Sequence, residues 1–254
     1  MASESRRKAR VDDFGRAYAG SQLQVQIYVN RHPEELSQRV LDALPSLATF
    51  NARLRWVSPL ERERFAEYQD RAFLDAVGLG HLADSLRRFW PRGGPAWDAL
   101  AAVEVAGSVE RRGVVLVEAK SHPSEIYGSG CQASPRSRGR IEAALDRTKR
   151  WLGVPEDVDW TGPLYQSANR LAHLYFFREV VNTPAWLVNV YFLGDPHSPT
   201  EREEWQTALA QVKAELGLTG IAVSHTAEVF LQARGRRQLV EPTDKQSGGK
   251  PSVS

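Results

Sequence analysis

The spacing of apolar residues along the chain predicts alternating strands and helices. Stretches in which apolar and polar residues alternate, or in which a short apolar run is unbroken, are typical of β-strands. They lie at 23–29, 54–57, 97–105, 113–121, 185–193 and 227–232. Apolar residues at helical spacing predict helices that begin near Pro33 and that cover 58–77, 141–152, 163–181 and 200–216. This order of elements predicts an α/β protein.

Local signals place several of these elements more closely. The strand at 185–193 is apolar on both faces, so we expect it at the centre of the sheet. The strands at 97–105 and 113–121 flank a polar turn around 108–112 and predict a hairpin. Gly78 and Gly217 are expected to end helices in the left-handed conformation. Capping boxes are predicted for Ser58 with Glu61 and for Thr200 with Glu203. The expected buried stripes of two helices are Leu36, Val40 and Leu44, and Trp205, Leu209, Val212 and Leu216.

The ends of the chain differ from its middle. Residues 1–18 are basic and polar, and residues 235–254 contain few large apolar groups, so both are predicted to be flexible tails. Between them, residues 19–234 are expected to form a single domain, a normal size for one hydrophobic core. No apolar run approaches the roughly 20 residues that span a bilayer. The first residues lack a secretory signal, and the lone Cys131 cannot form an internal disulfide, so we expect a cytoplasmic protein without membrane contact.

The net charge of +2 attracts nucleic acid only weakly, so any such binding would depend on local clusters of cations. One candidate cluster is a loop rich in Ser, Gly and Pro followed by a helix, with Arg136, Arg138 and Arg140 in the loop and Arg147, Lys149 and Arg150 on the helix. The alternative interpretation is an ordinary solvated loop and helix face.

A group of charged residues at the ends of the predicted hairpin strands suggests chemistry. Glu118 and Lys120 follow the apolar run 114–117 and are two residues apart, so they share one face of the strand. If the hairpin is symmetric about residue 109, Asp98 lies opposite Lys120 and diagonal to Glu118 on that same face. A shift of one residue would turn Asp98 to the other face.

Two carboxylates and an amine on one face suit metal-assisted hydrolysis of a phosphodiester. Hard oxygen donors favour Mg²⁺, so Asp98 and Glu118 are the predicted ligands, with the Ala119 carbonyl as a further ligand. Lys120 is expected to orient or deprotonate the attacking water.

The segments Pro95-Ala96-Trp97-Asp98 and Glu118-Ala119-Lys120 resemble the PD-(D/E)XK nuclease superfamily. This resemblance covers about 61–194 and implies a restriction-endonuclease-like fold, a mixed β-sheet flanked by helices on both faces. It also implies Mg²⁺-dependent cleavage of nucleic acid, DNA rather than RNA, with Mn²⁺ as a substitute. Many nucleases of this fold dimerise, which leaves a homodimer open here, and some members of the superfamily have lost catalysis.

The resemblance suggests two further catalytic residues. Many members use an acid from the first core helix, for which Glu67 is the candidate, with Glu63 and Asp70 as alternatives and a solvated helix face as another interpretation. Some members also carry a Gln on the helix after the motif. Here Gln166 shares a helical stripe with Arg170 and His173, and such a stripe could hold phosphate or water by hydrogen bonds.

Two rival interpretations come from other classes. The same fold could serve as a non-catalytic nucleic-acid-binding or scaffold domain, or the motif could be accidental in an unrelated α/β enzyme. The sequence supports neither a zinc site nor a serine nucleophile, because the His and Cys spacing and the surroundings of Ser129 lack the required patterns.

Overall fold

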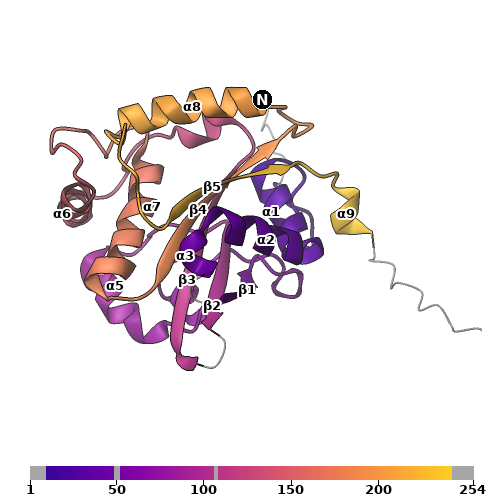
Figure 1. The fold of residues 1–254 in the computed structure, drawn as a ribbon, viewed down its shortest axis with the longest axis horizontal. Coiled ribbons are helices and arrows are strands. Elements are labelled where there is room, and N and C mark those ends of the chain that lie inside the picture. The colour runs from indigo at the N-terminus through magenta and orange to yellow at the C-terminus, as the bar shows by residue number, and fades with distance from the viewer. Residues whose placement is uncertain (1–9, 49–51, 106–107, 242–254) are drawn as a thin grey trace, which may run out of the picture.

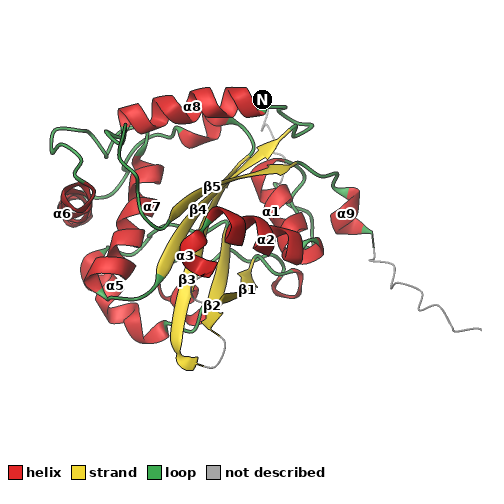
Figure 2. Ribbon diagram, viewed as in Figure 1, coloured by secondary structure: helices red, strands yellow, loops and turns green. Residues whose placement is uncertain are grey.

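A mixed five-stranded sheet forms the centre of the protein. The computed structural model describes residues 10–48, 52–105 and 108–241 (Figure 1). The strands, in both chain and sheet order, are β1 Ala52–Ser58, β2 Ala99–Val105, β3 Ser108–Lys120, β4 Ala185–Leu193 and β5 Thr226–Gln232. Strands β1, β2 and β3 form an antiparallel meander, and β4 and β5 continue the sheet in parallel (Figure 2). The predicted α/β class is confirmed.

Helices cover both faces of this sheet. The helical elements are α1 Gly20–Arg31, α2 Pro33–Ala43, α3 Pro45–Ala48, η1 Glu61–Glu63, α4 Asp70–Ala76, η2 Gly80–Leu82, α5 Ala83–Phe89, η3 Pro123–Ile126, α6 Pro135–Leu152, α7 Tyr165–Tyr175, η4 Phe176–Val180, α8 Arg202–Glu215 and α9 Arg237–Val240. Helices α1 to α3 pack on one face, and α4 to α8 pack on the other. Among the described residues, none of the helices has the length and apolar character needed to cross a bilayer.

The two central strands are buried on both sides, as their composition predicts. Along β3, Val114 and Leu116 join the core beneath α4 to α8, whereas Val115 and Val117 join the core beneath α1 and α2. Strand β4 lies between β3 and β5 and spans the predicted 185–193. Its position follows from its lack of a polar face, because only a central strand can bury both sides.

The segment predicted as a strand at 23–29 is instead helix α1. All seven of its residues are buried, because α1 lies between the sheet and the segments at the two chain ends. The apparent alternation comes from Gln24 and Gln26, whose amides are buried and bonded to backbone. Gln24 exchanges two hydrogen bonds with the backbone of Arg234, and Gln26 does so with Ala17 and Gly15. Tertiary burial of these amides overrides the local pattern.

The single helix predicted at 58–77 is also wrong. Ser58 ends β1, its hydroxyl donates to the Ala66 carbonyl, and the chain then forms η1, a turn and an extended segment before α4 begins at Asp70. Arg64 and Phe65 have left-handed backbone angles, φ 54° and 57°, which interrupt any helix. The predicted helix end is confirmed, since Gly78 follows α4 with φ 78°.

The hairpin of β2 and β3 is confirmed, but its register differs from the symmetric prediction. Leu100 pairs with Leu116, two residues from its predicted partner. The polar turn was expected at 108–112, whereas β3 already begins at Ser108 and residues 106–107 lie outside the described part of the chain. The capping box predicted for Thr200 and Glu203 is displaced by one residue, because Glu201 and Glu204 form the capping box of α8.

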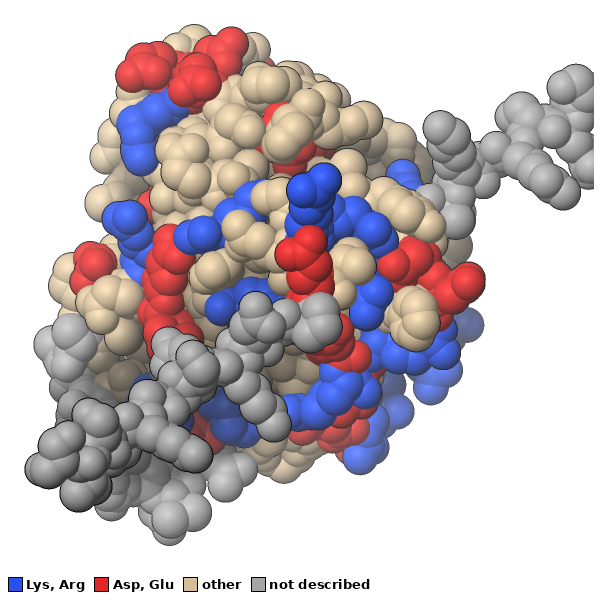
Figure 3. Space-filling model, turned by 90° about the vertical axis from the view of Figure 1, so that its right-hand side faces the viewer, with Lys and Arg blue, Asp and Glu red and all other residues tan. Residues whose placement is uncertain are grey.

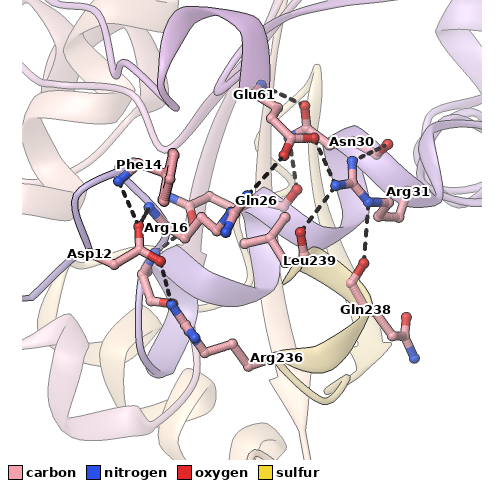
Figure 4. A network of polar contacts seen from close by, with 11 residues as sticks. Asp12, Phe14, Arg16, Gln26, Asn30, Arg31, Glu61, Arg236, Gln238 and Leu239 are labelled. Atoms are coloured by element: carbon pink, nitrogen blue, oxygen red, sulfur yellow. Dashed lines mark hydrogen bonds and ion pairs between the residues drawn. The ribbon is translucent and has the colours of Figure 1, made fainter. Parts of the chain in front are cut away.

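Residues near both chain ends, which were predicted to be tails, pack together against α1 (Figure 4). Ala17 and Leu239 are buried beside Leu23, Ile27 and Phe65. An ion pair of 2.7 Å joins Arg236 to Asp12, and Arg31 of α1 donates to the carbonyls of Gln238 and Leu239. Residues 10–18 and 235–241 are therefore part of the packed domain, while the rest of both predicted tails lies outside the described residues.

Candidate active site

The carboxyl end of β3 carries a glutamate and a lysine into the interior. Glu118 and Lys120 point to the same side as Leu116, towards α7, because side chains alternate along a strand. The side chain of Glu118 is 8% exposed and that of Lys120 is 12% exposed. Lys120 Nζ lies 2.5 Å from Glu118 Oε1, so the two predicted groups form an ion pair.

Asp98 lies beside this pair, just before β2 begins. Its Oδ2 accepts a hydrogen bond from the Ala119 backbone N–H at 2.7 Å. The paired register ends at Ala99 and Val117, and Asp98 forms a bend just before it. Its side chain lies on the α7 side of the sheet, where it lines a cavity together with Gln166 and Arg170. The Ala119 carbonyl is directed to the Asp98 side, since the N–H and C=O of a strand residue point the same way.

Arg170 of α7 packs over the sheet and forms an ion pair with Glu118. Its Nε donates to Glu118 Oε2 at 2.6 Å, its other nitrogens donate to the Ala96 carbonyl and to Asn169 Oδ1, and its guanidinium lies 5.1 Å from the centre of the Trp97 ring. Arg170 was predicted to bind nucleic acid from an exposed helix stripe. It is instead buried and belongs to the acid and amine cluster.

Glu67 reaches the site from the extended segment before α4, and not from the helix on which it was predicted. The neighbouring Tyr68 pairs with Trp97 in an antiparallel bridge, which brings Glu67 opposite Asp98. Gln22 of α1 donates to Glu67 Oε1 at 3.1 Å. The alternative candidates, Glu63 and Asp70, have other partners: Glu63 pairs with Arg62, and Asp70 accepts from the backbone of Gly93 and Gly94.

The charges of this cluster perturb one another. Burial, and then the charge of Glu118, raises the pKa of Asp98 to about 8. Burial alone would raise the pKa of Glu118, but Arg170 and Lys120 outweigh it and hold that pKa below its usual range. The pKa of Glu67 is raised, chiefly by burial and further by the charge of Glu118. Three carboxyl groups thus share two cations, and the raised pKa of Asp98 favours its neutral, protonated form at pH 7.

Two cavities meet at this cluster. Glu67 and Asp98 line one of about 450 Å³, Glu118 and Lys120 line another of about 310 Å³, and Gln166 and Arg170 line both. The three predicted residues therefore converge without facing a single common pocket, because Arg170 stands between them. Gln166 lies one turn before Arg170, at the boundary of the two cavities, as the shared stripe predicts.

The oxygen atoms offered here are of the type that a hard divalent cation binds. Asp98, Glu118 and the Ala119 carbonyl offer oxygen, and Mg²⁺ in proteins is commonly held by one or two carboxylates with water filling the other positions. Within the described residues, no three His, Cys, Asp or Glu side chains are grouped so that they could hold an ion together. Both oxygens of Glu118 are already in ion pairs, so a cation there would share this carboxylate with Lys120 or displace Arg170.

The predicted cation cluster on α6 is only partly available to a ligand. Arg136 and Arg140 are exposed, and they lie on the helix itself, which begins at Pro135, and not in the predicted loop. Arg138 pairs with Glu142, and Arg147 lies over the Phe89 ring. Lys149 is buried: its Nζ donates to the carbonyls of Glu156 and Val158 and pairs with Asp146, so it stabilises the loop after α6.

Charges of both signs are mixed on another side of the molecule. Figure 3 shows Lys and Arg side chains lying among Asp and Glu on the face that carries α1 and α9. Beside α1 and α9, Arg31 pairs with Glu61 at 2.7 Å and Arg236 pairs with Asp12 at 2.7 Å, which illustrates how cations are neutralised locally. This face therefore gives little support to polyanion binding.

Sequence reasoning missed Asn189. It pairs in register with Glu118 and is the polar interruption of the otherwise apolar β4. That interruption was a usable signal, because a central strand rarely carries a polar side chain without a role or a partner.

Comparisons of this chain with protein family models, with curated proteins and with solved structures gave no match. The functional proposal therefore depends on the residues of the site.

Proposed function

We propose that this protein is a divalent-cation-dependent nuclease of the restriction-endonuclease-like class, acting on DNA in preference to RNA. The observation that carries the proposal is that adjacent strands bring Asp98 and the Glu118-Ala119-Lys120 segment to one side of the sheet, beside Gln166 of α7. A mixed sheet with helices on both faces is also the arrangement that the sequence resemblance implies.

Each residue of the site has a task suited to phosphodiester hydrolysis. Asp98, Glu118 and the Ala119 carbonyl would hold Mg²⁺ or Mn²⁺, and a bound cation neutralises phosphate charge and acidifies a bound water. Lys120 Nζ donates hydrogen bonds that orient the attacking water and a phosphate oxygen, while Glu118 holds this amine in place. The Gln166 amide supplies a further donor, and Glu67 keeps negative charge near the cation position.

One observation favours a second candidate, a non-catalytic nucleic-acid-binding or scaffold domain of the same fold. Arg170 already supplies a positive charge to Glu118 at 2.6 Å. A guanidinium that stays there would prevent Glu118 from binding a divalent cation through this oxygen. The two candidates differ in one property: the nuclease needs Glu118 to accept a divalent cation, and the scaffold does not.

The test is metal-dependent cleavage by the full chain. Protein freed of metal with a chelator is incubated with labelled single- and double-stranded DNA and RNA, with and without Mg²⁺ or Mn²⁺. Cleavage is expected only with cation and is expected to fall by about 10²–10⁴-fold in Lys120→Met. Arg55→Met is the matched control, since Arg55 is also a strand cation paired with a glutamate. Cation binding without cleavage, or cleavage unchanged in Lys120→Met, would reject the nuclease.

A further inference from the structure

The cavity of about 310 Å³ beside Lys120 has a composition that catalysis alone does not explain. It lies between β3 to β5, α7, α8 and the segment 216–223. One wall is formed by Glu118, Lys120, Gln166 and Arg170, which are the groups that would handle a phosphate. The remainder is mainly apolar, with Leu187, Val212 and Val223 among its lining residues.

Polar groups occur in this apolar wall where they could recognise the edge of a ring. Asn189 lines the cavity next to Glu118 in the sheet register, and its amide offers a donor and an acceptor side by side. Tyr191, two residues along β4, presents an aromatic ring that is held by Trp205 at 4.7 Å and by Phe230 at 5.6 Å between ring centres. At the rim, Lys213 and Glu228 form an ion pair of 2.7 Å.

We infer that this cavity binds a nucleobase, that of the nucleotide whose phosphate lies at Lys120 and Gln166. The inference rests on the proposed function and specifies its substrate: one base is drawn out of a strand into the cavity. An Asn amide can pair with two positions of a base edge, and an aromatic side chain can contact the face of the ring. The volume is at the lower end of the range for ligand pockets, suited to a single nucleoside and too small for a base pair.

This assignment explains why the cavity combines an apolar lining with a charged mouth. Enzymes that act on an unpaired nucleotide place the base between apolar and aromatic side chains and leave the phosphate among cations. In this protein the apolar part belongs to β4, α8 and the segment 216–223, and the phosphate-binding part belongs to β3 and α7. Single-stranded nucleic acid, or a nucleotide extruded from a duplex, is therefore the substrate class.

The test is an equilibrium measurement that does not depend on cleavage. Oligonucleotides carrying one 2-aminopurine, at the end or in the interior, are titrated with the full chain in the presence of chelator, and 2-aminopurine ribonucleoside monophosphate is titrated in parallel. Entry of the base beside Tyr191 is expected to change its fluorescence. A response to the oligonucleotides identifies a strand as the source of the base, and a response to the monophosphate alone identifies a free nucleotide.

Two matched variants locate the response. Ala222→Trp places a large ring at the rim of the cavity, where Ala222 is exposed, and should weaken base binding at least tenfold. Ala210→Trp, at an exposed position on α8 outside the cavity lining, should leave binding unchanged. Asn189→Leu should reduce discrimination between bases when unlabelled oligonucleotides that differ in one base compete with the 2-aminopurine probe.

A fluorescence response that persists in Ala222→Trp, or no response with the unaltered chain, would overturn the base site. Either result could occur together with metal-dependent cleavage that requires Lys120. In that case the nuclease proposal would stand and the base site alone would fail. Conversely, a response lost in Ala222→Trp without any cleavage would support the base site and reject catalysis.

Discussion

Replacing Arg170 by methionine should destabilise the protein strongly, because it would leave Glu118 buried with only half of its compensation. The side chains of Arg170 and Glu118 are 6% and 8% exposed, and the guanidinium also donates to the Ala96 carbonyl. Removing one partner of a buried ion pair costs about 3–5 kcal/mol, since the remaining charge lacks water. Against a typical free energy of unfolding of about 5–15 kcal/mol, this loss is large.

The assay is equilibrium unfolding in urea, followed by tryptophan fluorescence at neutral pH. Arg55→Met is the control, because its ion pair with Glu104 is about half exposed and should contribute less than about 1 kcal/mol. The triple variant Arg170→Met/Glu118→Leu/Lys120→Met should recover most of the lost stability, since it removes both ion pairs of Glu118 together and leaves neither partner unpaired. A loss in Arg170→Met as small as that in Arg55→Met would refute the buried pair.

Divalent cation extends this experiment to the proposed function. In the nuclease, Mg²⁺ replaces the missing positive charge, so it should stabilise Arg170→Met by about 2–3 kcal/mol at a concentration near 100 times its dissociation constant. It should stabilise the unaltered chain less, because Arg170 competes for the same carboxylate. Equal responses of the two proteins to Mg²⁺ would show that the guanidinium and the cation do not compete.

Two further changes test the packing around the site. Burial lowers the pKa of His173 to about 4, below its ordinary value of about 6.5, so the unfolded chain binds its proton first as pH falls. The unfolding free energy should therefore drop by about 3 kcal/mol between pH 6.5 and 4 through this residue. His173→Leu should remove that part of the pH dependence. If the unfolding free energy from urea titrations depends on pH equally in both proteins, His173 does not titrate as a buried group. Gly130 has φ +75°, and an added Cβ would lie 2.8 Å from the Thr161 carbonyl oxygen, so Gly130→Ala should cost about 1–3 kcal/mol. Gly139→Ala, in α6 with open space around it, should instead stabilise by about 0.5–1 kcal/mol, and equal unfolding midpoints for the two variants would contradict this account.

The strand part of the site was predictable because side-chain direction along a strand repeats every two residues. The hairpin register differs from the symmetric prediction by two residues, and both Asp98 and Glu118 lie on the α7 side, each lining a cavity with Gln166 and Arg170. The identity of its hydrogen-bond partner, the Ala119 N–H, depends on where β2 begins, which the apolar pattern does not define.

The helical part of the site was harder to predict. Gln166 and Arg170 do share a stripe, but the pattern assigned Arg170 to ligand binding from an exposed surface and not to an ion pair with Glu118. A charged side chain on an amphipathic helix is predicted to face solvent unless its ion-pair partner is known. Here the partner lies 52 residues away on β3, and no local pattern reports a contact over that separation.

The position of Glu67 shows how the chain ends act on the site. The first turn of α1 makes two hydrogen bonds to the site and its surroundings. Gln22 donates to Glu67, and Ser21 donates to Glu125 of η3, the short helix that follows Lys120. The position of α1 is in turn fixed by buried Gln24 and Gln26, whose amides bond the backbone of Arg234 near one chain end and of Gly15 and Ala17 near the other. Because a buried amide without partners is costly, α1 cannot shift unless both terminal segments shift with it. The acid opposite Asp98 is therefore oriented through residues that the sequence pattern assigned to a strand, to the N-terminal tail and to the last position of the predicted domain.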